Sequence, residues 1–98
     1  MSYDEFLIAD ARLVILKELA RQPGHSLNET IIVAVLDQFA HRRSRDWVRT
    51  QLRKLEEIGA VSLVEAGSVL IATLKRAGLD HVEMRSFLEG VARPSPES

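Results

Sequence analysis

The short connection between two helix-like stretches is the feature that most restricts the fold. Only residues 40–44 separate a predicted helix whose apolar stripe ends at Phe39 from a predicted helix whose apolar stripe begins at Val48. A link this short forces two helices to cross sharply, as in a helix-turn-helix. We expect the apolar sides of the two helices to meet in one core. The residues predicted to meet there are Val35, Leu36 and Phe39 in the earlier helix and Val48, Leu52 and Leu55 in the later one, whose apolar stripe continues to Ile58.

Local start and stop signals predict where the helices begin and end. Ser2 and Ser26 are each followed three residues later by a glutamate, the pattern of a capping box at the start of a helix. The run Gln22-Pro23-Gly24 ends the first helix. Ser44 is the predicted N-cap of the third helix, and Gly59 is the predicted left-handed residue just beyond its end.

The pattern after Gly59 changes to that of a β-hairpin. Two β-rich runs, 60–65 and 69–74, are joined by Ala66-Gly67-Ser68, which is typical of a hairpin turn. A last helix is expected from Lys75 or Arg76 to Glu89.

The predicted fold class is mainly α with a small hairpin, in the order helix, helix, helix, hairpin, helix. Residues 1–92 are expected to form a single domain, because a chain of 98 residues is too short for two cores. Residues 93–98 contain two prolines and are expected to be a flexible tail.

The charge of the third predicted helix is the main indication of function. The whole chain has a net charge of −1, yet residues 41–54 hold six basic side chains against the single acid Asp46. A basic segment on an acidic body predicts one oriented, positively charged surface.

Helical periodicity places these cations away from the core. If Val48, Leu52 and Leu55 face inward, Arg45, Asp46, Arg49, Thr50 and Arg53 lie on or near the opposite side. Such a helix fits the major groove of DNA, where arginine reads guanine and cations bind phosphates. The candidate DNA-binding residues are Arg42, Arg43, Arg45, Arg49, Thr50, Arg53 and Lys54.

Different roles are expected within this set. Arg49 is the first choice for base recognition, and Arg42, Arg43, Arg53 and Lys54 suit phosphate contacts. The alternative is a solvated surface in which Arg53 and Lys54 pair with glutamates 56 and 57.

Several other polar or aromatic side chains are expected to have minor roles. Trp47 either packs beside the core or stacks on a nucleotide. His41 is expected beside a phosphate, and His81 on the surface of the last helix. Glu29 and Asp37 are predicted to be solvated acids rather than a catalytic pair.

Several functional classes have no support in the sequence. There is no cysteine, which excludes disulfides and thiolate metal sites. No nucleophile triad or glycine-rich phosphate loop is recognisable, so we expect no enzyme activity and no cofactor. No apolar run approaches the ~20 residues needed to cross a bilayer, and the cytoplasm is the expected location.

The chain resembles a winged helix-turn-helix domain. The likeness rests on Ser44-Arg45-Asp46-Trp47-Val48-Arg49, on Leu52, on residues 55–61 and on Leu74-Lys75-Arg76-Ala77-Gly78-Leu79. This resemblance implies a transcriptional regulator that inserts helix 44–58 into the major groove of double-stranded DNA. It also implies a homodimer formed through the first and last helices.

The chain also resembles two narrower families, and the ligand residues of the second are missing here. The chain is similar to small winged-helix proteins of Mu-like prophages in Leu27-Asn28-Glu29, Val35-Leu36-Asp37, His41-Arg42, the Arg45…Val48-Arg49 pair and residues 90–94. It is also similar to the metal-sensing arsenic-repressor type. That family's ligands are missing here, because there is no cysteine and no second histidine suitably spaced after His81. No metal site is expected.

These observations leave two functions open. The first is a DNA-binding regulator or phage accessory factor. The second is a non-catalytic interaction module, for example in phage assembly or packaging, which uses the same fold as a scaffold.

Overall fold

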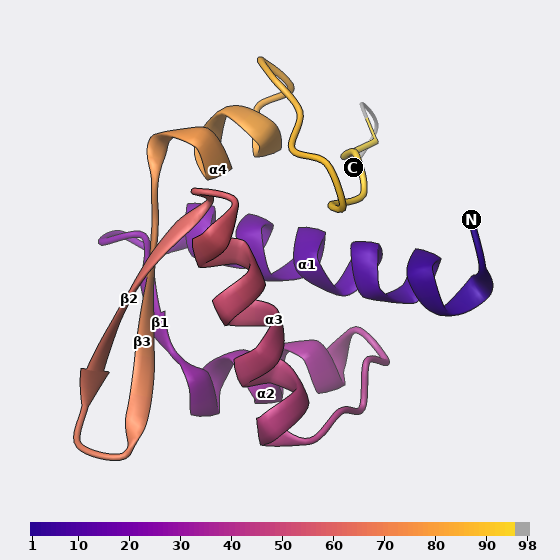
Figure 1. Ribbon diagram of the computed structural model, residues 1–98. Helices are drawn as coiled ribbons and strands as arrows, with labels where there is room; N and C mark the ends of the chain where they lie inside the picture. Colours follow the sequence, from indigo (N-terminus) through magenta and orange to yellow (C-terminus); the bar gives the residue numbers. More distant parts are fainter. Residues whose placement is uncertain (96–98) are drawn as a thin grey trace.

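A computed structural model describes residues 1–95 and shows helices packed against a small antiparallel sheet (Figure 1). In this part of the chain there are four helices and three strands. The helices are α1 (Tyr3–Arg21), α2 (Glu29–Gln38), α3 (Arg45–Glu57) and α4 (Arg76–Val82). The strands are β1 (Ser26–Asn28), β2 (Val61–Ala66) and β3 (Val69–Leu74). The expected three helices, hairpin and final helix are confirmed. Of the predicted flexible tail, residues 93–98, positions 96–98 lie outside the described residues.

Most predicted helix ends and the hairpin are confirmed by local hydrogen bonds. The Ser2 hydroxyl accepts from the Glu5 backbone N–H at 3.1 Å, and the Ser44 hydroxyl accepts from the Trp47 N–H at 3.1 Å. Gly59 has a φ of +81°, as a glycine beyond a helix end requires. Strands β2 and β3 pair in register from Val61↔Leu74 to Ala66↔Val69.

The start of the second helix differs from the prediction, because residues 26–28 form strand β1. This strand pairs with β3, which makes β3 the centre of a sheet in the order β1-β3-β2. The Ser26 hydroxyl lies 2.6 Å from that of Thr73 and is therefore used between strands. The N-cap of α2 is Asn28, whose Oδ1 accepts from the Ile31 N–H at 2.9 Å. The Ser26 capping box is wrong because a strand pairing distant in sequence takes up this segment.

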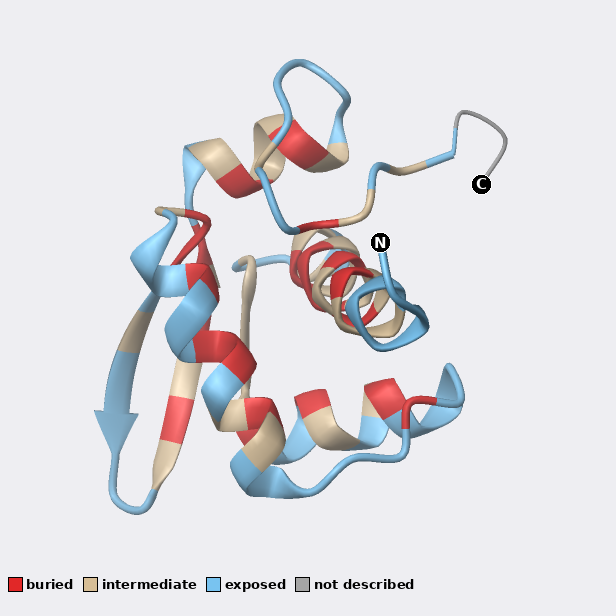
Figure 2. Ribbon diagram, turned by 45° about the vertical axis from the view of Figure 1, so that its right-hand side comes forward, coloured by how far each residue is buried: buried red, intermediate tan, exposed pale blue. Residues whose placement is uncertain are grey.

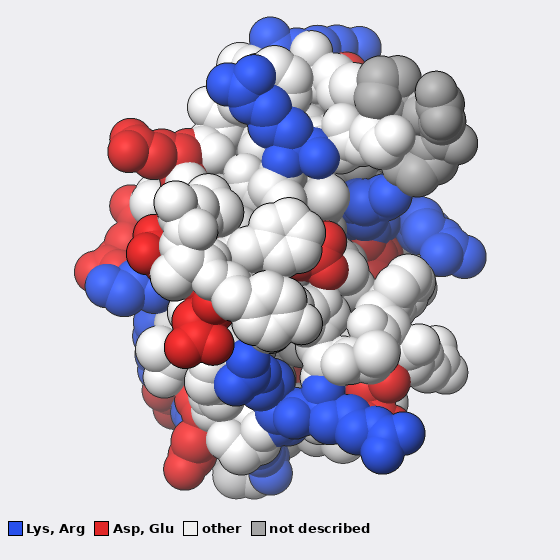
Figure 3. Space-filling model, turned by 90° about the vertical axis from the view of Figure 1, so that its right-hand side faces the viewer, with Lys and Arg blue, Asp and Glu red and all other residues white. Residues whose placement is uncertain are grey.

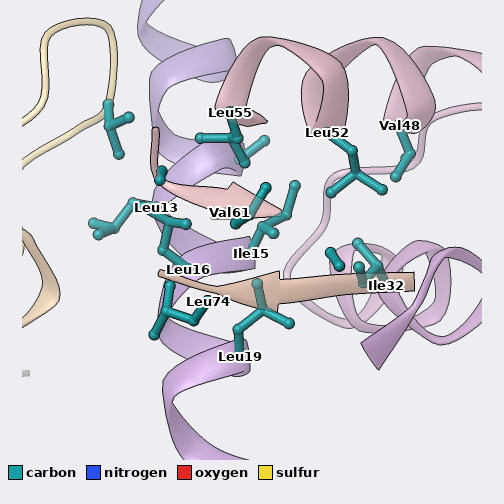
Figure 4. Packing of buried hydrophobic residues seen from close by; sticks show 14 of the residues in the cluster. Leu13, Ile15, Leu16, Leu19, Ile32, Val48, Leu52, Leu55, Val61 and Leu74 are labelled. Carbon is teal, nitrogen blue, oxygen red and sulfur yellow. The ribbon is translucent and has the colours of Figure 1, made fainter. Parts of the chain in front are cut away.

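The core lies between α1, α3 and the sheet, with α2 closing one end. Figure 4 shows side chains from these elements converging, and Figure 2 shows the buried residues on the inward side of α3 and on β3. Within the predicted apolar stripes, Leu36, Val48, Leu52 and Leu55 are fully buried. Phe39 and Ile58 are not: both are C-cap residues, where the helical path ends, and they are 54% and 40% exposed.

The last helix is much shorter than predicted. It ends at Val82, and Met84 has a φ of +61°, which breaks the helical path. The cause is His81, which is fully buried rather than on the surface. Its Nδ1 accepts from the Leu88 N–H at 2.9 Å, and its Nε2 lies 2.8 Å from the carbonyl oxygen of Ala92. Residues 83–92 therefore fold back through a series of turns and bends across α4 and α1, with Val91 buried.

None of the helices within residues 1–95 has both the length and the apolar character needed to span a lipid bilayer.

Candidate nucleic-acid interface

Helix α3 lies across the front of the molecule beside the hairpin, with its polar side toward solvent (Figure 1, Figure 2). Val48, Leu52 and Leu55 anchor it inward, and each has no exposed surface. The predicted orientation of the helix is therefore confirmed. Gln51 is also buried at the inner edge, where its Oε1 accepts from Nε of Arg12 at 2.9 Å.

Two arginines of α3 converge on one buried carboxylate. Nε of Arg45 lies 2.8 Å from Oε2 of Glu29, and Nε of Arg49 lies 3.6 Å from the same oxygen. The other oxygen of Glu29 accepts the backbone N–H of Leu70 in β3. Glu29 is fully buried, so the prediction of a solvated acid is wrong. The carboxylate connects the start of α2, the start of α3 and the hairpin.

These contacts keep Glu29 ionised despite its burial. Burial by itself would raise the pKa of Glu29, because a charge is disfavoured away from water. The hydrogen bonds from Arg45 and Leu70 and the charges of Arg45 and Arg49 outweigh this effect, and they hold the pKa of Glu29 below its usual value.

Three other cations of the predicted set also lie near acids, but at the surface. Arg42 is 3.4 Å from Asp37, Arg53 is 3.4 Å from Glu65, and Lys54 is 3.4 Å from Glu57. All six side chains are at least half exposed. Ion pairs of this kind contribute little and exchange readily with water or another ion.

The arginines expected side by side on the outward face of α3 are therefore partly paired with acids. The acids that pair with Arg45 and Arg53 come from α2 and β2, and no helical pattern within α3 reveals them. The predicted pairing of Lys54 with Glu57 is confirmed, whereas Arg53 pairs with Glu65. Glu56 instead accepts the Leu63 N–H at 3.2 Å.

Arg43 and Thr50 complete the predicted set. The guanidinium carbon of Arg43 lies 4.6 Å from the ring centre of Trp47, within cation–π range. Trp47 is half-buried against the core, which confirms its packing role. Within residues 1–95, no ion pair involves Arg43. The Thr50 hydroxyl donates to the Asp46 carbonyl oxygen at 3.1 Å, inside its own helix.

His41 fixes the turn before α3 rather than facing outward. It is only 7% exposed, and its Nε2 lies 2.7 Å from Oδ2 of Asp10 in α1. The predicted phosphate contact of His41 is therefore wrong. The pair connects residues 40–44 to α1 and so positions Arg42 and Arg43.

Positive charge is concentrated in the first half of α3 and the turn before it. That part brings together Arg42, Arg43, Arg45 and Arg49 against Glu29, Asp37 and Asp46. In the second half, Arg53 pairs with Glu65 and Lys54 pairs with Glu57. The region able to attract a polyanion is thus smaller than the sequence predicts.

This chain is similar to a known phage protein over nearly its whole length. It is 36% identical over 95 residues to the uncharacterized protein gp26 of Escherichia phage Mu, a match covering 97% of this chain and 98% of that protein. The chain belongs to the phage Mu gp26 family. It is also 44% identical over 63 residues to an uncharacterized protein of Haemophilus influenzae, covering 64% of this chain and 61% of that protein.

The family relation supports the predicted phage context. No family model matches the chain, and no solved structure matches it.

A second surface lies at the start of α1. Met1, Tyr3 and Phe6 are 90%, 75% and 52% exposed. They adjoin a hollow of about 410 Å³ that is lined by Met1, Phe6, Ala9 and residues 90–93. Figure 3 shows this side of the molecule, where uncharged groups, including aromatic rings, lie between basic and acidic side chains.

Proposed function

We propose that this phage-family protein is a winged-helix protein that binds double-stranded DNA without catalysis, as a transcriptional regulator or an accessory factor. The order of elements supports this proposal: α2, the turn 40–44 and α3 correspond to the helix-turn-helix, and β2 with β3 corresponds to the wing. The cytoplasm is the proposed site of action.

The observation that carries the proposal is the excess of guanidinium groups at the start of α3. In a helix-turn-helix this end of the recognition helix approaches the bases. Arg45 and Arg49 share a single carboxylate, and Arg43 has no acidic partner within residues 1–95. The exposed Arg42–Asp37 pair can release its arginine to a phosphate at little cost. Arg42, Arg43, Arg45 and Arg49 are therefore the principal proposed contacts, with Thr50, Arg53 and Lys54 secondary.

A fluorescence anisotropy titration tests DNA binding. Labelled duplexes of random and phage-derived sequence are titrated with the protein at about 50 and 200 mM salt, because phosphate contacts make affinity salt-dependent. We expect Arg43→Ala and Arg49→Ala to weaken binding by about tenfold each. Arg85→Ala is the matched control, since Arg85 is exposed and pairs with Glu83 away from α3. Wild-type binding weaker than about 0.1 mM at low salt would refute the proposal.

The second candidate function is a protein-interaction module. It is favoured by the glutamates beside the second half of α3 and by the apolar hollow at the start of α1. Binding to a phage protein that persists at high salt, together with no measurable DNA binding, would favour this function.

We also propose a homodimer, with the contact at the first half of α1. The predicted long last helix cannot contribute to the dimer contact, because α4 ends at Val82. The segment that follows packs on α1 of the same subunit, where the Ala92 N–H donates to the Ala9 carbonyl oxygen at 3.1 Å. Tyr3 and Phe6 remain available for a partner subunit.

A further inference from the structure

We infer that Glu29 is a positioning residue for DNA binding, and that it holds the guanidinium groups of Arg45 and Arg49 together so that both donate to one backbone phosphate. This inference rests on the proposed DNA-binding function, and it gives Arg49 a phosphate contact in place of the base contact expected from the sequence. It assigns a role to the only fully buried carboxylate within residues 1–95.

The spacing of the two arginines explains why they need a shared partner. They lie four residues apart on α3, so their side chains project from the same side of the helix. Two cations at this spacing repel each other. Oε2 of Glu29 lies between the two Nε atoms, at 2.8 and 3.6 Å, and offsets the repulsion.

The carboxylate is itself firmly held. Its other oxygen accepts the Leu70 N–H from the central strand of the sheet. Glu29 is also the first residue of α2, where the helix dipole stabilises a negative charge. A side chain fixed at both oxygens and closed to solvent is a rigid anchor for the two arginines.

The contacts with Glu29 leave other donors on both guanidinium groups. A guanidinium has N–H groups at Nε and at both Nη atoms. Arg45 uses Nε for Glu29 and Nη2 for the carbonyl oxygen of Ser68 at 3.2 Å. The Nη groups of Arg49 make no hydrogen bond within residues 1–95. The two side chains are 47% and 34% exposed, so these donors can reach a ligand from solvent.

The charges match a phosphate diester. Two guanidinium groups and one carboxylate leave an excess positive charge, which one phosphate neutralises. Charge-assisted hydrogen bonds from arginine to phosphate are among the strongest in proteins. Prior positioning of both groups lowers the entropic cost of binding.

The decisive experiment is the DNA affinity of Glu29→Gln, because positioning and simple electrostatics predict opposite signs. Glutamine keeps an oxygen for the Leu70 N–H but loses the charge that holds the arginines. Positioning predicts affinity weaker by about tenfold, together with a salt dependence reduced by about one phosphate contact. Electrostatics alone predicts tighter binding, because a negative charge near the DNA is removed.

Glu65→Gln is the matched control. This substitution removes the carboxylate that pairs with Arg53. Glu65 is exposed at the surface and positions no other side chain within residues 1–95. We expect it to tighten binding slightly. If wild-type protein binds DNA and Glu29→Gln tightens binding as Glu65→Gln does, the inference is wrong and the proposed function stands. If wild-type protein does not bind, the proposed function itself fails.

A second variant covers the case in which Glu29→Gln does not fold. The double substitution Arg45→Lys with Arg49→Lys keeps both positive charges but removes the Nε donors and the planar fork. We expect it to bind at least tenfold more weakly than wild type while the thermal melt shows a folded protein. Affinity equal to wild type would overturn the inference.

Discussion

Glu29 shows how much of this protein depends on a single side chain. It is an acid at the start of a helix, which the sequence alone marks as a solvated cap partner. In the folded chain it is buried and joins two helices and a strand. The same three contacts, with Arg45, Arg49 and the Leu70 N–H, account for its contribution to stability and for its proposed role in DNA binding.

Replacement of Glu29 should produce a pH-dependent loss of stability. The folded-state pKa of Glu29 is lowered, so its stabilising contribution is present above the unfolded-state pKa, about 4.3 for glutamate. The contribution is lost as pH falls through the folded-state pKa, where the carboxyl group becomes neutral. We expect Glu29→Gln to lower the free energy of unfolding by about 2 kcal/mol at pH 7.

Urea unfolding of both proteins at pH 7, 5, 4 and 3 would measure this difference. It should stay constant above pH 5 and shrink below about pH 4. A difference that does not change with pH would mean that the carboxylate charge does not stabilise the fold.

Gly78 is a second residue whose importance comes from its neighbours. A Cβ atom at this position would lie 2.4 Å from the Ala60 carbonyl oxygen and 2.6 Å from Cδ1 of Leu74. The backbone of α4 therefore packs directly against the start of β2. We expect Gly78→Ala to destabilise the protein by about 1–3 kcal/mol, measured by thermal unfolding. Gly24→Ala is the control, because nothing lies within 4 Å of its added Cβ. Equal melting temperatures for the two variants would contradict this packing.

At the scale of elements, α2 depends on strand β1 for its start. Asn28 is both the last residue of strand β1 and the N-cap of α2, so the chain passes directly from the sheet into the helix. This arrangement places the next residue, Glu29, beside Arg45 and Arg49 of α3.

Removal of the Asn28 cap should destabilise α2. The Asn28 Oδ1 is the acceptor for the Ile31 N–H, and Asn28→Ala leaves that donor without its capping partner. We expect a loss of about 1 kcal/mol in the free energy of unfolding, measured in urea. Asn28→Ser retains a capping oxygen and should be close to wild type. If serine is as damaging as alanine, the side-chain cap is not the stabilising feature.

At the scale of the whole molecule, the proposed dimer contact is on the first half of α1, whereas the proposed DNA contacts are on α3 and the turn before it. We expect a dimer formed through α1 to leave the proposed DNA contacts on α3 of each subunit accessible. Phe6 and the hollow beside it are the proposed contact.

Sedimentation velocity can test this dimer. We expect wild-type protein to sediment as a dimer at about 50 μM and Phe6→Glu to sediment as a monomer, because a charge buried in an apolar contact is strongly unfavourable. Val64→Glu is the control: Val64 is apolar and 63% exposed on β2, away from α1. A wild-type monomer, or a dimer unaffected by Phe6→Glu, would contradict the proposed contact.

The sequence by itself determined the order of the helices, the ends of α1 and α3, the hairpin and the inward side of α3. These features follow from local rules: hydroxyl caps at Ser2 and Ser44, a left-handed glycine at Gly59, and apolar residues at helical spacing. Each depends on residues within about one turn of the position predicted. The seven predicted site residues were likewise placed on or beside one helix.

Only the tertiary structure decided which polar groups meet. Strand β1, the buried Glu29 and the His41–Asp10 pair join residues far apart in the sequence, and the fold-back held by His81 joins residues beyond the range of a helical turn. Burial decides the role of each group, because a carboxylate or an imidazole away from water must find a partner. Arg45 and Arg49 are therefore held together by the buried carboxylate of Glu29, a contact that no local sequence pattern predicts.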